Sequence, residues 1–530
     1  MSPMRSPGQG TAGRRLSISA LLVAAGMFLS RIAGYARTVL FSAIFGVESS
    51  AADAFNQAFK IPNFLQNLLG EGALSASLIP VYSGLLQEEN QARADRVARA
   101  VLSVLALVTA VIVLAGLVWT GPLVSVLAPG FEGAKRELTI ELVRILFPGI
   151  GLLVLSAWCL AVLNSHHRFF LSYVAPVLWN AAIIVALVIY RHAPQDVVAV
   201  RIAWAATLGA ALQLGVQIGP VWRLMAAHRT RTGEDVRDTV RQVLLTSLPV
   251  IFTRGVVQVS AFVDSQIASL LPTGAVTALA NATQLYQLPV SLFGSAVSSA
   301  ALPSLSAARA RDGASSLRAQ LVTSQRMITV FVVPSMIAFI AFGDVMIGML
   351  LQRGHFTRGD TLYVWGVLAG SSVGLVATTV GRLYTNAFYA LGDTRTPTIF
   401  AATRVALAAG LGYLAAIHLP PAVGVTSRWG AAGLTASAGL AGWVEFTLLR
   451  RTIQQRIGEL PSAFAFLART WIVAVAAAAA ASALRLVFSL DHLILRGVVM
   501  LGAYGALYLL LAHAAGLLVL KDFLRRVFRR

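Results

Sequence analysis

The chain has 530 residues, of which 57% are hydrophobic and only 12% are charged, and its mean hydropathy is +0.75. Soluble globular proteins carry about 25% charged residues, so this composition excludes an ordinary soluble enzyme. The net charge of +20 collects in short segments between apolar runs, which is typical of membrane proteins and argues against a nucleic-acid partner. The single cysteine, Cys159, excludes an intramolecular disulfide and a thiolate metal cluster.

Apolar runs recur along the whole chain, and many approach the roughly 20 residues that cross a bilayer as a helix. The sequence therefore predicts an all-α polytopic membrane protein with about 14 transmembrane helices. Residues 1–15 are rich in Ser, Gly, Pro and Arg and are predicted to form a disordered cytoplasmic tail, followed by a retained first span. The predicted spans are 16–45, 52–80, 98–128, 138–163, 170–191, 198–222, 243–270, 275–305, 323–351, 361–390, 396–418, 429–450, 464–486 and 494–520.

Arginines in the loops predict the orientation. If the N-terminus is cytoplasmic, the loops on that side hold roughly two to three times as many basic residues as the opposite loops. The cytoplasmic set includes Arg168, Arg223 and the basic tail 521–530. Both termini are therefore predicted to be cytoplasmic.

Two pairs of segments indicate an internal duplication. Residues 61–83 and 288–306 both start with an apolar residue before Pro and pass through Gly and small residues to a second Pro; 164–176 and 386–397 form the second pair. Both pairs are offset by a little over 220 residues. This predicts two six-helix lobes, 16–222 and 243–450, joined by a cytoplasmic linker, 223–242, and related by a pseudo-two-fold axis along the membrane normal. Spans 13 and 14, within 451–520, fall outside the duplication.

The first span carries Arg31 and Arg37 on either side of Gly34. A charge inside a span is costly and usually faces a cavity or a partner. Either arginine could instead extend to the membrane interface. We favour a cavity in which both bind an anion, with Gly34 as a hinge position.

The second span has a polar stripe along one helix face. Its members are Asp53, Asn56, Lys60, Asn63, Asn67 and Glu71. Pro62 removes a backbone hydrogen bond in the middle of this span, which predicts a kink. The stripe either lines a cavity or holds helices together, with Asp53 and Lys60 as an internal pair.

Spans 7 and 8 also carry polar residues within their apolar sequence. Span 8 carries Asn281 and Gln284, and its Pro289 corresponds to Pro62 in the duplication. Arg254 in span 7 supplies positive charge to the same cavity, pairs with Asp264, or acts as an interfacial anchor. Arg404 in span 11 is predicted to be a topology or headgroup residue.

These residues suggest an anionic amphiphile as substrate, because Arg binds diphosphate oxygens in a bidentate manner and Lys acts as a point charge. The sequence has no GxxxxGK[ST] loop, so we predict no ATPase and no enzyme activity. No metal or cofactor is predicted, since the adjacent His166 and His167 lack a third ligand.

The segment 30–83, "SRIAGYARTVLFSAIFGVESSAADAFNQAFKIPNFLQNLLGEGALSASLIPVYS", resembles the MurJ (MviN) family of lipid II flippases in the MOP exporter superfamily. Residues 271–306 resemble the eighth-span block of that family. The resemblance implies two lobes around a cationic cavity and two C-terminal helices that form a groove for the lipid tail. It implies that lipid II, the undecaprenyl-diphosphate-linked peptidoglycan precursor, moves from the cytoplasmic to the periplasmic leaflet of the bacterial inner membrane by alternating access. Arg31, Arg37, Asp53 and Lys60 match functional polar positions of the family.

Two positions depart from the family pattern. Many members have Arg where this chain has Gln66 and Gln284, and those arginines are thought to engage the diphosphate. We hypothesise that Arg254 compensates.

Three alternatives stay open. The first is a flippase for another polyprenyl-diphosphate-linked glycan, or a paralogue that has lost the essential activity. The second is a MATE-like drug/cation antiporter, which predicts an acidic cavity and 12 spans. The third is a scaffold that recruits cell-wall synthesis proteins. For a flippase, a dependence on membrane potential or on a monovalent ion is also open, and the expected partners are the lipid-linked anionic substrate, membrane lipids and cell-wall synthesis proteins.

Overall fold

The computed structural model describes residues 9–226, 236–295, 297–298, 305, 314–460, 464–487 and 492–517; these form helices with short connections and contain no β-strand. The chain divides into two compact units. Unit 1 comprises Met1–Phe45 and Ser49–Gln258, and unit 2 comprises Gly46–Glu48 and Val259–Arg530. The division falls within one helix, α9. The predicted lobe limits, 16–222 and 243–450, remain predictions.

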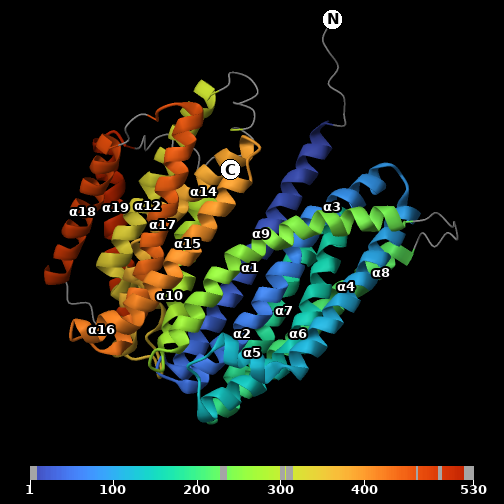
Figure 1. Cartoon of the computed structure of the whole chain (residues 1–530), viewed down its shortest axis with the longest axis horizontal. Helices are drawn as coiled ribbons and strands as arrows, with labels where there is room; N and C mark the ends of the chain where they lie inside the picture. The colour runs from blue at the N-terminus through green and yellow to red at the C-terminus, as the bar shows by residue number, and fades with distance from the viewer. Residues whose placement is uncertain are drawn as a thin grey trace, which may run out of the picture. The chain divides into compact units, whose positions relative to one another are not determined.

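Unit 1 is an all-helical bundle, coloured from blue to green in Figure 1. Its central helix is α6, which is mostly buried and packs against α2, α3, α4 and α8. Residues 9–15, which the sequence assigns to a disordered tail, belong to α1. The helices of unit 1 are α1 (Gln9–Phe45), α2 (Ser50–Leu69), α3 (Glu71–Gln87), α4 (Gln91–Val118), α5 (Thr120–Leu127), α6 (Gly133–Ser165), α7 (Phe169–Tyr190), α8 (Gln195–Ala226) and most of α9 (Arg237–Ser269).

Unit 2 is also helical, and its mostly buried helix is α12. Two short π-helical segments, η1 and η2, continue α10 and α15. The elements are α10 (Ala275–Pro289), η1 (Val290–Ser295), α12 (Ala314–Leu351), α13 (Arg358–Ser372), α14 (Leu375–Ala390), α15 (Arg395–Tyr413), η2 (Leu414–His418), α16 (Leu419–Ala422), η3 (Ser427–Trp429), α17 (Gly430–Ile457), α18 (Phe464–Val487) and α19 (Leu493–Ala514).

Among the described residues, ten helices are long and apolar enough to cross a membrane, or eleven if α13 and α14, bent by 41°, form one span. These eleven coincide with predicted spans 1, 3–6 and 9–14. Predicted spans 2, 7 and 8 correspond to α2–α3, α9 and α10, which are helical but fall outside that group. Helices α3 and α10, with 17 and 15 residues, are shorter than the spans in that group. The predicted all-α fold class is confirmed.

The internal duplication is visible in the local geometry. Helix α6 runs from Gly133 to Ser165, and the α13–α14 pair runs from Arg358 to Ala390, so both ends lie 225 residues apart. In each unit the next two helices pack in the same way, since α6 and α7 contact α8 while α13, α14 and α15 contact α17.

The loops after these helices carry the same hydrogen bonds. In unit 1, the amides of His167 and Arg168 donate to the carbonyls of Asn164 and Leu163 at 3.0 and 2.8 Å. In unit 2, the amides of Gly392 and Asp393 donate to Tyr389 and Phe388, both at 3.0 Å. His167 and Gly392 both have positive φ, 57° and 78°. The two loops are therefore structural counterparts at an offset of 225 residues.

The break in the second span lies at Gly70, between α2 and α3. A Cβ at Gly70 would collide with the carbonyl oxygen of Gln66, so this tight turn requires glycine. The side chain of Pro62 lies outside the described residues, and its kink remains a prediction. In unit 2, α10 ends at Pro289 and the chain continues as the π-helical η1.

The last two helices pack against α12 (Figure 1). The hydroxyl of Tyr504 on α19 donates to the carbonyl of Pro334 on α12 at 2.9 Å. Gly497 on α19 lies against the side chain of Met349, with no room for a Cβ. Predicted spans 13 and 14 therefore form an addition to unit 2 that α12 anchors.

Candidate functional site

The candidate site in unit 1 is built where α1 packs against α7 and where side chains of α2 reach α1. Gly34 lies one turn before Arg37 on α1, and a Cβ at Gly34 would lie 3.8 Å from Oδ1 of Asn180 on α7. This is an ordinary van der Waals distance, so α1 passes close to the buried Asn180 amide at Gly34 and an alanine would also fit there. This approach places Arg37 beside α7.

The Arg37 guanidinium lies beside a pair of aromatic side chains. Its central carbon is 5.5 Å from the ring centroid of Phe59 on α2 and 5.0 Å from that of Trp179 on α7. The two rings also stack on each other, with centroids 5.5 Å apart and planes 22° apart. Aromatic faces attract cations by about 0.5–2 kcal/mol, and more strongly out of water, so the rings hold the guanidinium in place.

Two polar atoms at this site are buried without a hydrogen-bond partner among the described residues. They are Nη1 of Arg37 and Oδ1 of Asn180. The Asn180 amide nitrogen is satisfied, because it donates to the carbonyl of Pro176 at 3.1 Å. An unpaired buried donor costs about 1–3 kcal/mol, and more when it is charged. The site therefore offers one cationic donor and one acceptor to a ligand.

Asp53 pairs with a residue that the sequence does not predict for the site. Its Oδ2 accepts from Nζ of Lys135 on α6 at 2.7 Å, and the two side chains are 1% and 15% exposed. Lys135 also lies 4.1 Å from the ring centroid of Phe131. Asp53 is in the first turn of α2, where a negative charge is favoured by the helix dipole. This ion pair ties α2 to α6.

The corner before α2 is fixed by a short polar network. Ser49 caps α2, since its Oγ accepts from the amide of Ala52 at 3.2 Å and donates to Oε1 of Gln195 at 2.7 Å. The amide nitrogen of Gln195 donates to the carbonyl of Ile44 at 3.1 Å. The end of α1 and the start of α2 are therefore both attached to α8.

The other predicted residues do not converge on Arg37 through any contact described here. Arg31 and Asn63 are exposed, and Lys60 is half-buried. Gln284 is exposed on α10, in unit 2. The Arg254 side chain lies outside the described residues. The roles proposed for these five residues remain predictions.

Trp179, Asn180 and Lys135 are site residues that the sequence reasoning missed. Asn180 follows Trp179 in the middle of an otherwise apolar span, so a signal was present. Lys135 gave no such signal, because it lies near the start of α6, where a basic residue next to a loop is common.

Arg404, which the sequence predicts to be a topology or headgroup residue, forms an ion pair with Glu445. Its Nε lies 3.0 Å from Oε2 of Glu445 on α17, and the two side chains are 23% and 20% exposed. Glu445 is an acid within a candidate span, and a lone charge there is costly. The pair therefore serves the internal packing of unit 2.

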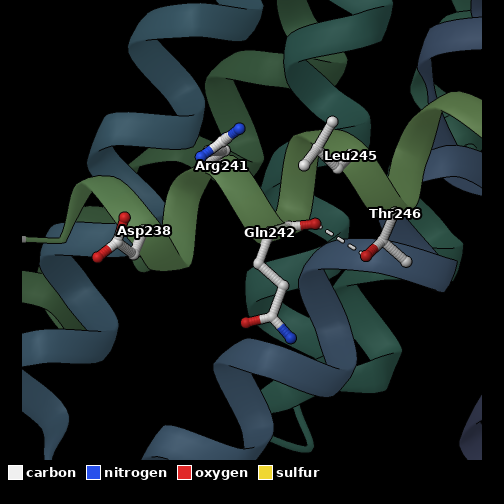
Figure 2. A pocket seen from close by; sticks show the side chains of 5 residues that line it. All are labelled: Asp238, Arg241, Gln242, Leu245 and Thr246. Atoms are coloured by element: carbon white, nitrogen blue, oxygen red, sulfur yellow. Dashed lines mark hydrogen bonds between the residues drawn. The ribbon is translucent and has the colours of Figure 1, made fainter.

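Helix α9 carries a shallow hollow in unit 1, shown in Figure 2. Its lining residues are Asp238, Arg241, Gln242, Leu245 and Thr246. The Thr246 hydroxyl donates to the carbonyl of Gln242 at 2.8 Å (Figure 2). All five lining residues lie on one helix, whereas ligand sites draw polar groups from several directions. Among the described residues, no group of three His, Cys, Asp or Glu could hold a metal ion.

Comparison with known proteins gives consistent results. The family model described as "Lipid II flippase MurJ" matches residues 41–503. A probable lipid II flippase MurJ of Rhizobium meliloti (strain 1021) is 31% identical over 465 residues, covering 86% of this chain and 83% of that protein. The lipid II flippase MurJ of Burkholderia cenocepacia is 31% identical over 446 residues, covering 82% and 84%.

Two solved structures are similar in fold. A lipid II flippase MurJ in an inward closed conformation has a TM-score of 0.75 and 22% identity, covering 96% of this chain and 100% of that one. An inward-facing multidrug resistance MATE transporter of the MOP superfamily has a TM-score of 0.64 and 17% identity, covering 82% and 98%. At these identities the similarity is one of fold.

Proposed function

The chain belongs to the MurJ family of lipid II flippases, and we propose that it moves lipid II from the cytoplasmic to the periplasmic leaflet of a bacterial inner membrane. It is a multi-pass membrane protein and a transporter. We place both termini in the cytoplasm, on the basis of the loop arginines. In this role it supplies the precursor for cell-wall synthesis.

The observation that carries the proposal is the Arg37 guanidinium, whose Nη1 is buried and has no hydrogen-bond partner among the described residues. Among the described residues no carboxylate forms an ion pair with it. The two aromatic rings offset part of the cost of burying this charge, and an anionic ligand would offset the rest. A diphosphate fits this need because its oxygens accept charge-assisted hydrogen bonds from arginine.

The neighbouring residues extend this site. We propose that Arg31 and Lys60 attract the diphosphate, and that Oδ1 of Asn180 accepts from a donor on the substrate head group. The undecaprenyl tail then stays in lipid, beside the C-terminal helices. Arg254 remains our candidate for the positive charge lost at Gln284; if Arg254→Ala leaves transport unchanged, that assignment is wrong.

We propose that the cycle runs by alternating access without ATP hydrolysis. Moving one charge across 100 mV is worth about 2.3 kcal/mol. The membrane potential, or a monovalent ion gradient, can therefore reset a site from which an anion has left. Collapse of both the potential and the monovalent ion gradients at constant ATP should stop transport, whereas ATP depletion with both maintained should not.

Growth rescue tests the proposed function. Bacterial cells depleted of their own lipid II flippase should grow when they express this chain. The Arg37→Ala variant should fail to rescue at an equal protein level in the membrane. The control, Arg191→Ala, changes an exposed arginine at the far end of α7 and should rescue normally. Rescue by Arg37→Ala would remove Arg37 from the transport site.

A further inference from the structure

A separate pocket of about 550 Å³ lies in unit 1 where α6 ends, α7 begins and α8 nears its end. Its lining combines three basic side chains with apolar ones. The basic residues are His167, Arg168 and Arg223, and the apolar residues include Phe169, Phe170 and Leu171. None of its lining residues is acidic or an amide. The pocket is therefore suited to an anion that carries an apolar group.

The tight loop between α6 and α7 sets this arrangement. The amide of Arg168 donates to the carbonyl of Leu163 at 2.8 Å, and His167 has a φ of 57°, which a residue other than glycine rarely adopts. Helix α7 begins at the next residue, Phe169. The loop thus presents His167 and Arg168 to solvent directly beside aromatic residues. His166 plays a different part, since its Nε2 lies 3.0 Å from the hydroxyl of buried Tyr82.

The counterpart loop in unit 2 shows what is unusual here. Asp393 occupies the position of Arg168 and is satisfied internally: its carboxylate accepts from Thr396 and pairs with Arg456 at 2.7 Å. In unit 1, Arg168 and Arg223 are both exposed, and no described carboxylate pairs with either. The unit 1 loop therefore keeps positive charge available to a ligand.

The position of the pocket along the α7–α8 hairpin matches a membrane interface. The two helices pack together and are joined by a short loop. Arg168 and Arg223 lie at one end, while Arg191 and Arg201 lie at the other, 22–23 residues away along each helix. At 1.5 Å per residue this is about 33 Å, close to the roughly 30 Å thickness of the hydrocarbon core.

We propose that this pocket binds an anionic phospholipid of the cytoplasmic leaflet. Arg168 and Arg223 hold the phosphate, and His167 adds a donor beside it. The acyl chain lies against Phe169, Phe170 and Leu171; Phe170 is 51% exposed. Basic pockets between helices on the cytoplasmic side are suited to anionic headgroups. The absence of carboxylate and amide groups from the lining disfavours a sugar-peptide head group, which would need many polar partners.

Lipid titration of the purified full-length chain tests the proposal without lipid II. Thermal unfolding is followed in a neutral detergent as phosphatidylglycerol, phosphatidylcholine or inorganic phosphate is added. A ligand that binds the folded state raises the apparent Tm. Phosphatidylglycerol should raise it by about 2–4 °C or more. Phosphatidylcholine and inorganic phosphate should not, because one lacks net charge and the other lacks the acyl chains.

The matched variants use the same two helices. Arg168→Gln with Arg223→Gln should abolish the phosphatidylglycerol shift, while Arg191→Gln with Arg201→Gln should keep it. Arg168→Lys with Arg223→Lys retains the charge, and should keep most of the shift and rule out a folding defect. An equal shift with inorganic phosphate, a shift that survives in the first pair, or no shift in the wild type would each overturn the proposal. None of these results bears on lipid II transport, so the two proposals fail separately.

Discussion

The guanidinium of Arg37 on α1 lies 5.0 Å from the centroid of the Trp179 indole ring on α7, although Trp179 follows Arg37 by more than a hundred residues in the sequence. The indole nitrogen of Trp179 donates to the carbonyl of Ala206 at 3.0 Å, which fixes the ring against α8. Arg37 is therefore held by a ring that is itself held by the backbone. These contacts restrain the position of Nη1, as binding of a diphosphate by one guanidinium requires.

Replacing the Trp179 ring should weaken substrate binding. Trp179→Leu removes the closer aromatic face that positions the guanidinium, and we expect the less ordered Arg37 to bind lipid II with a roughly tenfold weaker Kd, about 1.4 kcal/mol. Phe59→Leu should have a smaller effect in the same direction. Phe41→Leu is the control, because the Phe41 ring stacks on Phe45 and is tilted against Phe55, whereas the described cation–π contacts of Arg37 are with Phe59 and Trp179. Equal losses in all three variants would show a general packing effect.

Breaking the Asp53–Lys135 pair should destabilise unit 1. Removal of one partner of a buried pair costs about 3–5 kcal/mol, and we expect the lower end because Lys135 is 15% exposed. Asp53→Asn and Lys135→Met should each lower the apparent Tm. The double variant should lose less than the sum of the two, which a double-mutant cycle measures.

The neighbouring Arg136 provides the control for that cycle. It is half-buried at most and donates to Ser125 in an exposed contact at 3.0 Å. Arg136→Gln should change stability by no more than about 0.5 kcal/mol. Additive losses at Asp53 and Lys135 would mean that the two residues stabilise the fold independently.

A methyl group at Gly439 should separate two helices. The backbones of Gly439 on α17 and Gly374 before α14 are in direct contact, so an added Cβ would collide with backbone atoms. Gly439→Ala should cost about 1–3 kcal/mol through overpacking. Gly410→Ala in α15 meets nothing within 4 Å, and should be neutral or stabilise the helix by about 0.5–1 kcal/mol. Thermal unfolding of both variants separates steric conflict from the intrinsic preference of alanine for helices.

Low pH should remove a local restraint in the loop before α15. Hydrogen bonds from the backbone and side chain of Thr396, together with Arg456, lower the pKa of Asp393 to about 2, from 3.8. Because the folded-state pKa is the lower one, the ionised carboxylate stabilises the fold above pH 3.8, and this contribution disappears as the pH falls through 2. The Tm difference between wild type and Asp393→Asn should be constant near neutral pH and shrink in that window. A difference that does not change with pH would contradict this.

The sequence predicts the positions of the helices better than the side-chain contacts between them. Hydropathy and helix breakers located all fourteen segments, eleven of which are apolar enough to span a membrane among the described residues, because these signals depend only on residues close in the chain. The Asp53–Lys135 pair joins residues 82 positions apart. On sequence alone, Lys60 on the same helix was the only candidate partner that periodicity could offer.

The duplication was predicted, but its register was not. Matching residues by identity paired Asn164 with Asn386, 222 positions away. The hydrogen-bonded loops instead give 225, which places Tyr389 opposite Asn164. The difference is about one helical turn, so both alignments keep the same helix face, and only backbone geometry separates them.

The most direct test of the account is lipid II exposure in cells depleted of their own flippase and expressing this chain. An externally added toxin that cleaves only outer-leaflet lipid II reports the transported substrate. We expect cleavage with the wild-type chain and with Arg191→Ala, and none with Arg37→Ala at equal protein levels. Absence of cleavage with well-expressed wild-type protein, or full cleavage with Arg37→Ala, would contradict transport of lipid II through the Arg37 site.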